Sequence, residues 1–167
     1  MFTVEQLVDF YQLQPHPEGG FYKETYRSKE SISHPGLPER FKGERSFSTA
    51  IYFLLPAGHF SAFHRIKSDE LWHFYAGVAL NIYVINVEGT LTLINLGADI
   101  LNGETMQAIV PAGCWFASRP AKSTGYCFAG CTVSPGFDFA DFELAKAGEL
   151  TQIYPEHKEL IISLCRQ

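Results

Sequence analysis

The chain has 167 residues, of which 46% are hydrophobic and 14% aromatic, which is enough apolar material to bury the core of one globular domain. Its formal net charge is −5 and its lysines and arginines form no cluster, so nucleic acid is excluded as an expected partner. No apolar run approaches the roughly 20 residues that span a bilayer, so we expect no transmembrane helix and no membrane partner.

The N-terminal segment, MFTVEQLVDFYQL, predicts an amphipathic helix. Thr3 to Gln6 matches a capping box, apolar residues recur at helical spacing, and the pattern stops near Leu13, ahead of two prolines. The segment contains acidic residues and lacks a basic n-region, so we expect no signal peptide and a cytoplasmic protein. The whole chain has four cysteines, which follow no zinc spacing and are expected to be reduced thiols. Cys127 and Cys131 are expected to be buried as small hydrophobic residues.

The next segment, HPEGGFYKETYRS, predicts a turn followed by a strand. Strict alternation places Tyr22, Glu24 and Tyr26 on one face and Arg27 on the opposite face. The polar stretch from residue 28 to 44 is expected to be a surface loop, with a mobile flap over a pocket as the alternative.

From about residue 47 to 133 the chain predicts eight short strands rich in β-branched and aromatic residues and separated by turns. Strands at roughly ten-residue spacing with no helical pattern between them predict an all-β barrel or jelly-roll sandwich. After residue 136 the period becomes helical. Asp138 or Asp141 is expected to cap a helix over FELAKA that ends at Gly148, and Pro155 to open a last helix.

One stretch, GHFSAFHRIKSDELWHFYAG, carries a ligand-like spacing: Gly58, His64, Glu70 and Gly77, with Ile66 where a second histidine would complete it. This pattern resembles the first motif of the cupin superfamily, G-x5-H-x-H-x3,4-E-x6-G. In the second cupin motif, Pro111 and Gly113 match and Phe116 stands in the histidine position. The resemblance implies a single cupin jelly-roll β-barrel domain over residues 1–167, with its core at about 47–133, an N-terminal helix and short C-terminal helices.

The chain is also similar over most of its length to one small subfamily of uncharacterised cupins (the cupin 5 type). The shared stretches are HPEGG with the following strand, KSDELWHFYAG, VPAGCW and SPGFDFADFEL. The resemblance also implies a homodimer. In such dimers an N-terminal strand often crosses to the partner, so Glu18, Glu24 and Arg27 are expected to complete either a pocket or an interface.

Cupin metals usually bind three histidines and a carboxylate, and only His64 and Glu70 of those positions carry donors here. Transition-metal sites normally need at least three protein ligands, so no cofactor is expected and a divalent metal on His64 and Glu70 stays an alternative. His73 could replace a ligand only through a bulge, because strand alternation points it away from Glu70 and Trp72.

A pocket built on His64 and Glu70, walled by Phe60, Trp72, Phe74 and Phe116, is typical of a small-molecule site. A histidine beside a carboxylate can move protons near neutral pH, so we expect binding of a small polar metabolite. The leading hypothesis is a metal-independent isomerase or epimerase acting on a sugar or keto compound. Metal-free cupins of this kind, such as the dTDP-sugar epimerases, add a tyrosine acid, for which Tyr52, Tyr83 and Tyr126 are candidates.

Two alternatives stay open. One is a small-molecule-binding cupin without catalysis, and the other is a divalent-metal oxygenase or isomerase. A nucleotide-sugar substrate has little support, because Arg27, Arg45 and Arg119 are scattered along the sequence and each is expected to form a surface salt bridge.

Overall fold

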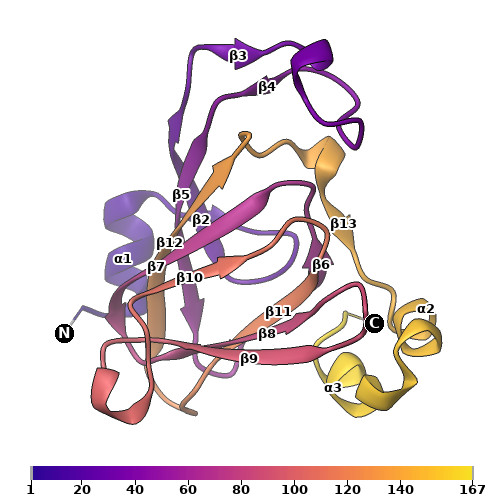
Figure 1. Ribbon diagram of the computed structural model, residues 1–167. Helices are drawn as coiled ribbons and strands as arrows, with labels where there is room; N and C mark the ends of the chain where they lie inside the picture. Colours follow the sequence, from indigo (N-terminus) through magenta and orange to yellow (C-terminus); the bar gives the residue numbers. More distant parts are fainter. Residues whose placement is uncertain (1, 167) are drawn as a thin grey trace.

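Two antiparallel sheets face each other in the computed structural model, which describes residues 2–166 (Figure 1). The first sheet has the order β1 (Gln14–Pro15), β2 (Phe21–Arg27), β5 (Thr49–Pro56), β12 (Tyr126–Ser134), β7 (Asp69–Gly77) and β10 (Gln107–Val110). The second has the order β13 (Glu143–Leu144), β6 (Ser61–Arg65), β11 (Trp115–Pro120), β8 (Leu80–Ile85) and β9 (Leu91–Leu96). All eight predicted strands are present as β5 to β12, which confirms the cupin-type jelly roll with terminal helices.

Apolar side chains from the inner faces of both sheets form the central core. Fully or almost fully buried members include Phe53 and Leu55 of β5, Trp72 of β7, Ile82 of β8 and Phe116 of β11. Alternate residues of each strand point into this space, which is the pattern expected of a half-buried antiparallel strand.

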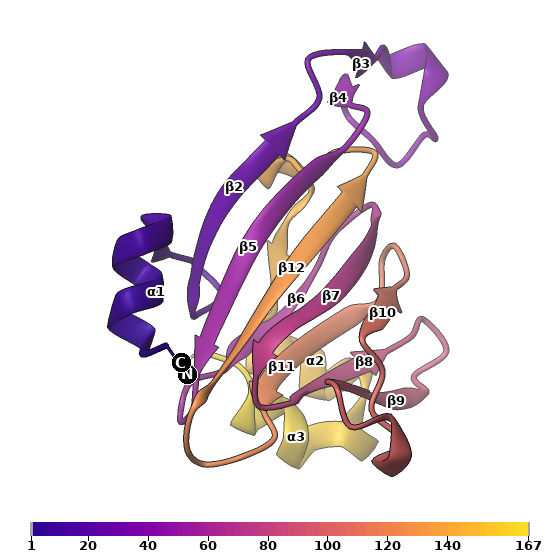
Figure 2. The same cartoon turned by 90° about the vertical axis from the view of Figure 1, so that its left-hand side faces the viewer.

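Helices cover the outer faces of both sheets. The helix α1 (Val4–Tyr11) starts with the predicted capping box between Thr3 and Gln6 and packs through Leu7 against the outer face of β5 and β12 (Figure 2). It ends before Gln12, which adopts a left-handed conformation. The C-terminal α2 (Ala147–Ile153) and α3 (Lys158–Ser163) pack on the outer face of the second sheet. None of the helices within residues 2–166 is long and apolar enough to cross a bilayer.

The prediction of a helix over FELAKA is wrong. Glu143 and Leu144 form β13 and pair with Arg65 and His64 of β6, because β6 would otherwise leave an open sheet edge. Asp138 does act as a cap, but of a single 3-10 turn over Phe139–Asp141. Helix α2 then begins only at Ala147 and continues through Gly148.

A β-bulge in β2 corrects the predicted faces of this strand. Glu24 pairs with Ile51, but the next paired residue, Tyr26, lies opposite Ala50, so Thr25 is the inserted residue. An inserted residue reverses the alternation beyond it. Arg27, opposite Thr49, therefore lies on the same face as Glu24 rather than on the opposite one.

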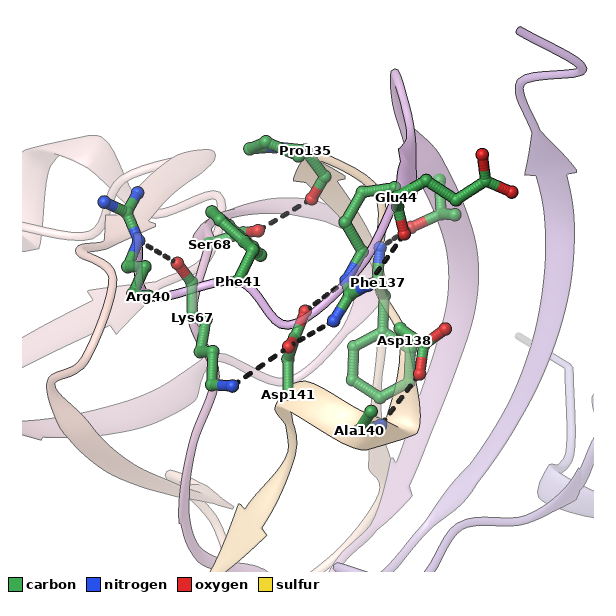
Figure 3. A network of polar contacts seen from close by, with 12 residues as sticks. Arg40, Phe41, Glu44, Lys67, Ser68, Pro135, Phe137, Asp138, Ala140 and Asp141 are labelled. Carbon is green, nitrogen blue, oxygen red and sulfur yellow. Dashed lines mark hydrogen bonds and ion pairs between the residues drawn. The ribbon is translucent and has the colours of Figure 1, made fainter. Parts of the chain in front are cut away.

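The segment predicted as a surface loop contains a short two-stranded arm, β3 (Ser31–Ile32) and β4 (Arg45–Ser46), at the upper end of the molecule in Figure 1. Arg45 is buried and donates two hydrogen bonds of 2.6 Å to the carboxylate of Asp141. Figure 3 shows Asp141 among its polar contacts, with Lys67 on its other side. The predicted surface salt bridge of Arg45 is therefore a buried one, which fastens the arm to the 3-10 turn. Arg119 instead donates a hydrogen bond to the hydroxyl of Tyr83.

Gly77, the last glycine of the first motif, allows the chain to pass close to β12. Its φ is +97°, and a Cβ there would collide with the carbonyl oxygen of Tyr126. We expect Gly77→Ala to lower the free energy of unfolding by more than the about 1–3 kcal/mol that a non-glycine residue at positive φ costs by itself, measured by urea denaturation. Gly58→Ala is the matched control, because φ is +83° there but nothing lies within 4 Å. An equal loss in both variants would contradict the steric explanation for Gly77.

Candidate functional site

A cavity of about 460 Å³ opens between the two sheets. The β2–β5 ladder supplies one wall, because the cross-strand pairs Tyr22/Phe53, Glu24/Ile51 and Arg27/Thr49 all face it. Strands β12, β7 and β6 contribute residues to the floor of the cavity, and the segment after β12 forms its rim. The remaining lining residues are His16, Glu18, His64, Ile66, Glu70, Cys131, Val133, Phe137, Asp138, Phe139 and Phe142. Side chains from distant parts of the chain therefore meet in one mostly apolar space with a few polar groups.

The HPEGG turn places Glu18 beneath His64. The turn is closed by backbone hydrogen bonds between His16 and Gly20 and between Gly19 and His16, both of 3.0 Å. Gly19, at φ +124°, lies so close to the carbonyl of Phe60 that a Cβ would collide with it. The carbonyl of Glu18 accepts a hydrogen bond of 2.8 Å from the backbone N–H of Ala62, which fixes the turn against the start of β6.

His64 and Glu18 form a buried pair. Nε2 of His64 lies 2.9 Å from Oε2 of Glu18, and the hydroxyl of Ser61 donates to Oε1 at 3.0 Å. Burial opposes ionisation of both groups, but their mutual attraction and hydrogen bonds outweigh it, raising the pKa of His64 and lowering the pKa of Glu18. Nδ1 of His64 lies 2.7 Å from the carbonyl oxygen of Ala62, which can only accept. The pair is therefore an imidazolium and a carboxylate, with both ring nitrogens in use.

Glu70 is the titratable group of the floor. It is 8% exposed and forms no ion pair within residues 2–166, and its polar neighbours are the thiol of Cys131 and the indole N–H of Trp72. Burial, together with the negative charge of Glu18, raises the pKa of Glu70 to about 7, although His64 and polar contacts with Cys131 and Trp72 act in the opposite direction. A carboxyl group with such a pKa can both take and return a proton near neutral pH.

His16 is a second histidine of the cavity, and sequence reasoning missed it. Its Nδ1 accepts a hydrogen bond of 3.3 Å from the backbone N–H of Glu18. Burial lowers the pKa of His16, although Glu18 opposes this effect. The ring is therefore neutral, with its proton on Nε2. The glycine-rich sequence around His16 predicts only a turn. The one local sign of a functional site is the charged Glu18, two residues later.

The predicted aromatic wall needs correction. The cavity is lined instead by Tyr22, Phe53 and three phenylalanines of the rim, Phe137, Phe139 and Phe142. Phe116 lies beneath the ring of His64, with centroids 4.0 Å apart, and Trp72 is buried against Phe53. Phe74 packs against the central core, and Phe60 belongs to the core under the C-terminal helices. The error arises because inward-facing aromatics fill the sandwich before any reach a cavity.

Other predicted side chains also lie elsewhere. His73 contacts Thr132 and Gln107 through its two ring nitrogens and does not line the cavity. Of the tyrosine acid candidates, Tyr52 and Tyr126 pack under α1, and Tyr83 packs under the C-terminal helices. The three residues left open between a pocket and an interface, Glu18, Glu24 and Arg27, all line the cavity.

The four cupin ligand positions of this chain do not fit a metal ion. Ile66 and Phe116 have no lone pair to donate, and the single nitrogen of His64 able to coordinate, Nε2, is bonded to Glu18. Throughout residues 2–166, no group of three or more His, Cys, Asp or Glu side chains is arranged to hold a metal. All four cysteines are buried as free thiols, and burial raises the pKa of Cys131 well above its usual value.

A jelly-roll sandwich with a cavity between its sheets, and with His64 and Glu70 at the spacing of the first cupin motif, defines a cupin. The chain belongs to the family described as Cupin superfamily (DUF985), whose model matches residues 5–145.

Several proteins are similar to this chain in sequence or in structure. Protein SO0799 from Shewanella oneidensis is 42% identical with a TM-score of 0.89, and each chain covers 99% of the other. A hypothetical protein from Leishmania major is 33% identical with the same TM-score, covering 99% of this chain and 100% of its own. The uncharacterised protein YML079W of Saccharomyces cerevisiae is 30% identical over an alignment of 154 residues, which covers 86% of this chain and 76% of that protein. Oxalate decarboxylase from Bacillus subtilis, 14% identical with a TM-score of 0.55, shares the fold alone.

Proposed function

We propose that this protein binds a small polar metabolite in the cavity and transfers a proton on it, with Glu70 as the acid–base group. The observation that carries the proposal is the environment of Glu70, a buried carboxyl group that lines the cavity and forms no ion pair within residues 2–166. Its pKa, raised to about 7, suits a group that exchanges protons at neutral pH.

The reaction class that this arrangement supports is an isomerisation or epimerisation next to a carbonyl of a sugar or keto compound. Ionised Glu70 removes a proton from the carbon beside the carbonyl, and the electron pair moves to the carbonyl oxygen. In an isomerisation, Glu70 returns this proton to the former carbonyl carbon while the hydroxyl proton of the first carbon passes to the former carbonyl oxygen. In an epimerisation, the first carbon takes a proton from solvent on its opposite face, and Glu70 releases its proton to solvent. The Nε2–H of His16 is the neutral donor available to the developing oxyanion.

The role of His64 differs from the one its position in the motif suggests. Because both of its nitrogens are engaged, we assign it to holding Glu18 rather than to removing a substrate proton. The same observation favours a second candidate function, a binding protein without catalysis, in which the His64–Glu18 pair only completes the polar floor.

Solvent deuterium exchange separates the two functions. In D2O, wild-type protein is incubated with glucose, fructose, dihydroxyacetone and pyruvate, and NMR follows deuterium at the carbon beside the carbonyl. Because ionised Glu70 is the base, we expect the rate to rise about tenfold per pH unit below about 7 and to level off above it. Thermal stabilisation by a sugar without deuterium incorporation would contradict the catalytic proposal and support the binding protein.

A further inference from the structure

The charges that line the cavity are unbalanced. Its carboxylates are Glu18, Glu24, Asp138 and, above about pH 7, Glu70, whereas its cations are Arg27 and protonated His64. An excess of carboxylates creates a negative potential that a low-dielectric cavity concentrates, so it repels anions and attracts cations.

Both cations are already used by protein groups. Arg27 donates to both oxygens of Glu24, at 3.0 and 2.7 Å, and a third hydrogen bond of 3.1 Å to the carbonyl of Phe137. His64 is held by Glu18 and Ala62. An entering carboxylate or phosphate would therefore find no uncommitted arginine fork, which is the group that usually binds such anions.

Two carboxylates of the cavity have no cationic partner among the ion pairs of residues 2–166. Glu70 lies at the floor, more than nine-tenths buried. Asp138 lies exposed at the rim, where its Oδ1 accepts a hydrogen bond of 2.8 Å from the backbone N–H of Ala140 and its Oδ2 accepts none from residues 2–166. Arg27 and Arg45 lie close enough to interact with its charge, but neither forms an ion pair with it. Glu70 lines the cavity and forms no ion pair, so a polar group of a ligand can reach its carboxyl group.

The rim around Asp138 is aromatic. Phe137 and Phe139 flank it in sequence, with ring centroids 5.0 Å apart, and Phe142 lies about equally close to both, at 6.4 and 6.1 Å. Phenylalanine ring faces carry negative electrostatic potential and attract organic cations. The negative charge of Asp138 and the phenylalanine rings at the mouth of the cavity therefore both favour an organic cation.

We propose that the metabolite bound in this cavity is an organic amine, with its ammonium group at Asp138 and the rim phenylalanines and its polar part at Glu70. The inference rests on the proposed role of the cavity as a small-molecule site, and it narrows the substrate class from sugars and keto compounds in general to those that carry an amino group. Keto acids and sugar phosphates are excluded as preferred ligands.

Two series of equal-sized probes test this inference by calorimetry at mildly acidic pH and low salt. The first compares glucosamine, glucose and glucuronate, and the second compares 2-phenylethylamine, 2-phenylethanol and phenylacetate. In at least one series we expect the amine to bind about tenfold more tightly than the alcohol or neutral sugar, and the anion to bind most weakly.

Asp138→Asn is the decisive variant, because its amide oxygen keeps the hydrogen bond to Ala140 while the charge is removed. We expect a two- to fivefold loss of amine affinity and no loss for the neutral probe. Asp9→Asn on exposed α1 removes the same charge away from the cavity and should change neither.

Equal affinities within both series, tighter binding of the anions, or no measurable binding of either amine would overturn the inference. An unchanged amine preference in Asp138→Asn would overturn the assignment to this carboxylate. The measurement is of binding, so absence of deuterium exchange would count against the proposed catalysis and not against the amine.

Discussion

The Glu70→Gln variant is expected to exchange protons of a carbonyl ligand at least about a hundredfold more slowly than the wild-type protein. Glutamine has nearly the same shape as protonated glutamate but cannot accept the proton, so binding should survive while exchange is lost. Deuterium incorporation by NMR and calorimetric affinity, measured on the same protein, give the two readouts.

The same variant is expected to be more stable than the wild type at about pH 8. Unfolded Glu70 ionises near 4.5, whereas folded Glu70 keeps its proton up to about 7, so the unfolded state binds fewer protons between these values. The wild type therefore loses stability as the pH rises through this window, by about 3 kcal/mol at most. Glu70→Gln lacks this loss, so the two proteins should match at about pH 4 and diverge by pH 8.

Urea denaturation across this pH range measures the difference. Glu159→Gln, an exposed position of α3, is the control and should follow the wild type at every pH. If the stability difference between Glu70→Gln and the wild type were the same at pH 4 and at pH 8, and the variant exchanged protons at the wild-type rate, Glu70 would have no part in the mechanism.

The second large effect is expected from Arg45→Met, which leaves the buried carboxylate of Asp141 without its two short hydrogen bonds. Breaking a buried ion pair from one side costs about 3–5 kcal/mol. Lys67, whose Nζ lies 3.4 Å from Asp141, remains and favours the lower end of this range. The 3-10 turn that carries Asp138 and Phe139 should loosen, so ligand affinity should fall together with stability.

Two comparisons make the Arg45 prediction specific. Arg65→Met breaks the ion pair with Glu143, in which the side chain of Arg65 is 42% exposed and that of Glu143 is 54% exposed. We expect this variant to lower the free energy of unfolding by about 1 kcal/mol or less. The double variant Arg45→Met/Asp141→Leu replaces both members of the ion pair, so no buried carboxylate is left without a partner, and part of the lost stability should be recovered. If Arg45→Met were no more destabilising than Arg65→Met, the arm would not be fastened by this pair.

The fold follows from the sequence because its strands are encoded locally. Alternating β-branched and aromatic residues between glycine and proline turns predict β5 to β12, and the Thr3–Gln6 pair predicts the start of α1. The β13 strand has no such signal, since two residues of FELAKA form a strand only where an open edge of β6 lies beside them.

The site is harder to predict, because its contacts join residues far apart in the sequence. Glu18 and His64 are 46 positions apart, and nothing local to HPEGG shows which histidine the turn faces. The cavity face of Arg27 depends on a bulge at Thr25, which strict alternation cannot anticipate. The spacing of the cupin motif does predict that His64 and Glu70 share a region, but not that Glu18 occupies the free nitrogen of His64.

The most direct test of the account is a ¹³C NMR titration of the Glu70 side-chain carboxyl carbon, assigned by its disappearance in Glu70→Gln. The account predicts a midpoint of about 7 for Glu70, caused by burial and the neighbouring Glu18, and a midpoint for Glu18 below the ordinary glutamate value. A Glu70 midpoint near 4.5 would contradict it, because Glu70 would then be an ordinary carboxylate and a weak base at neutral pH.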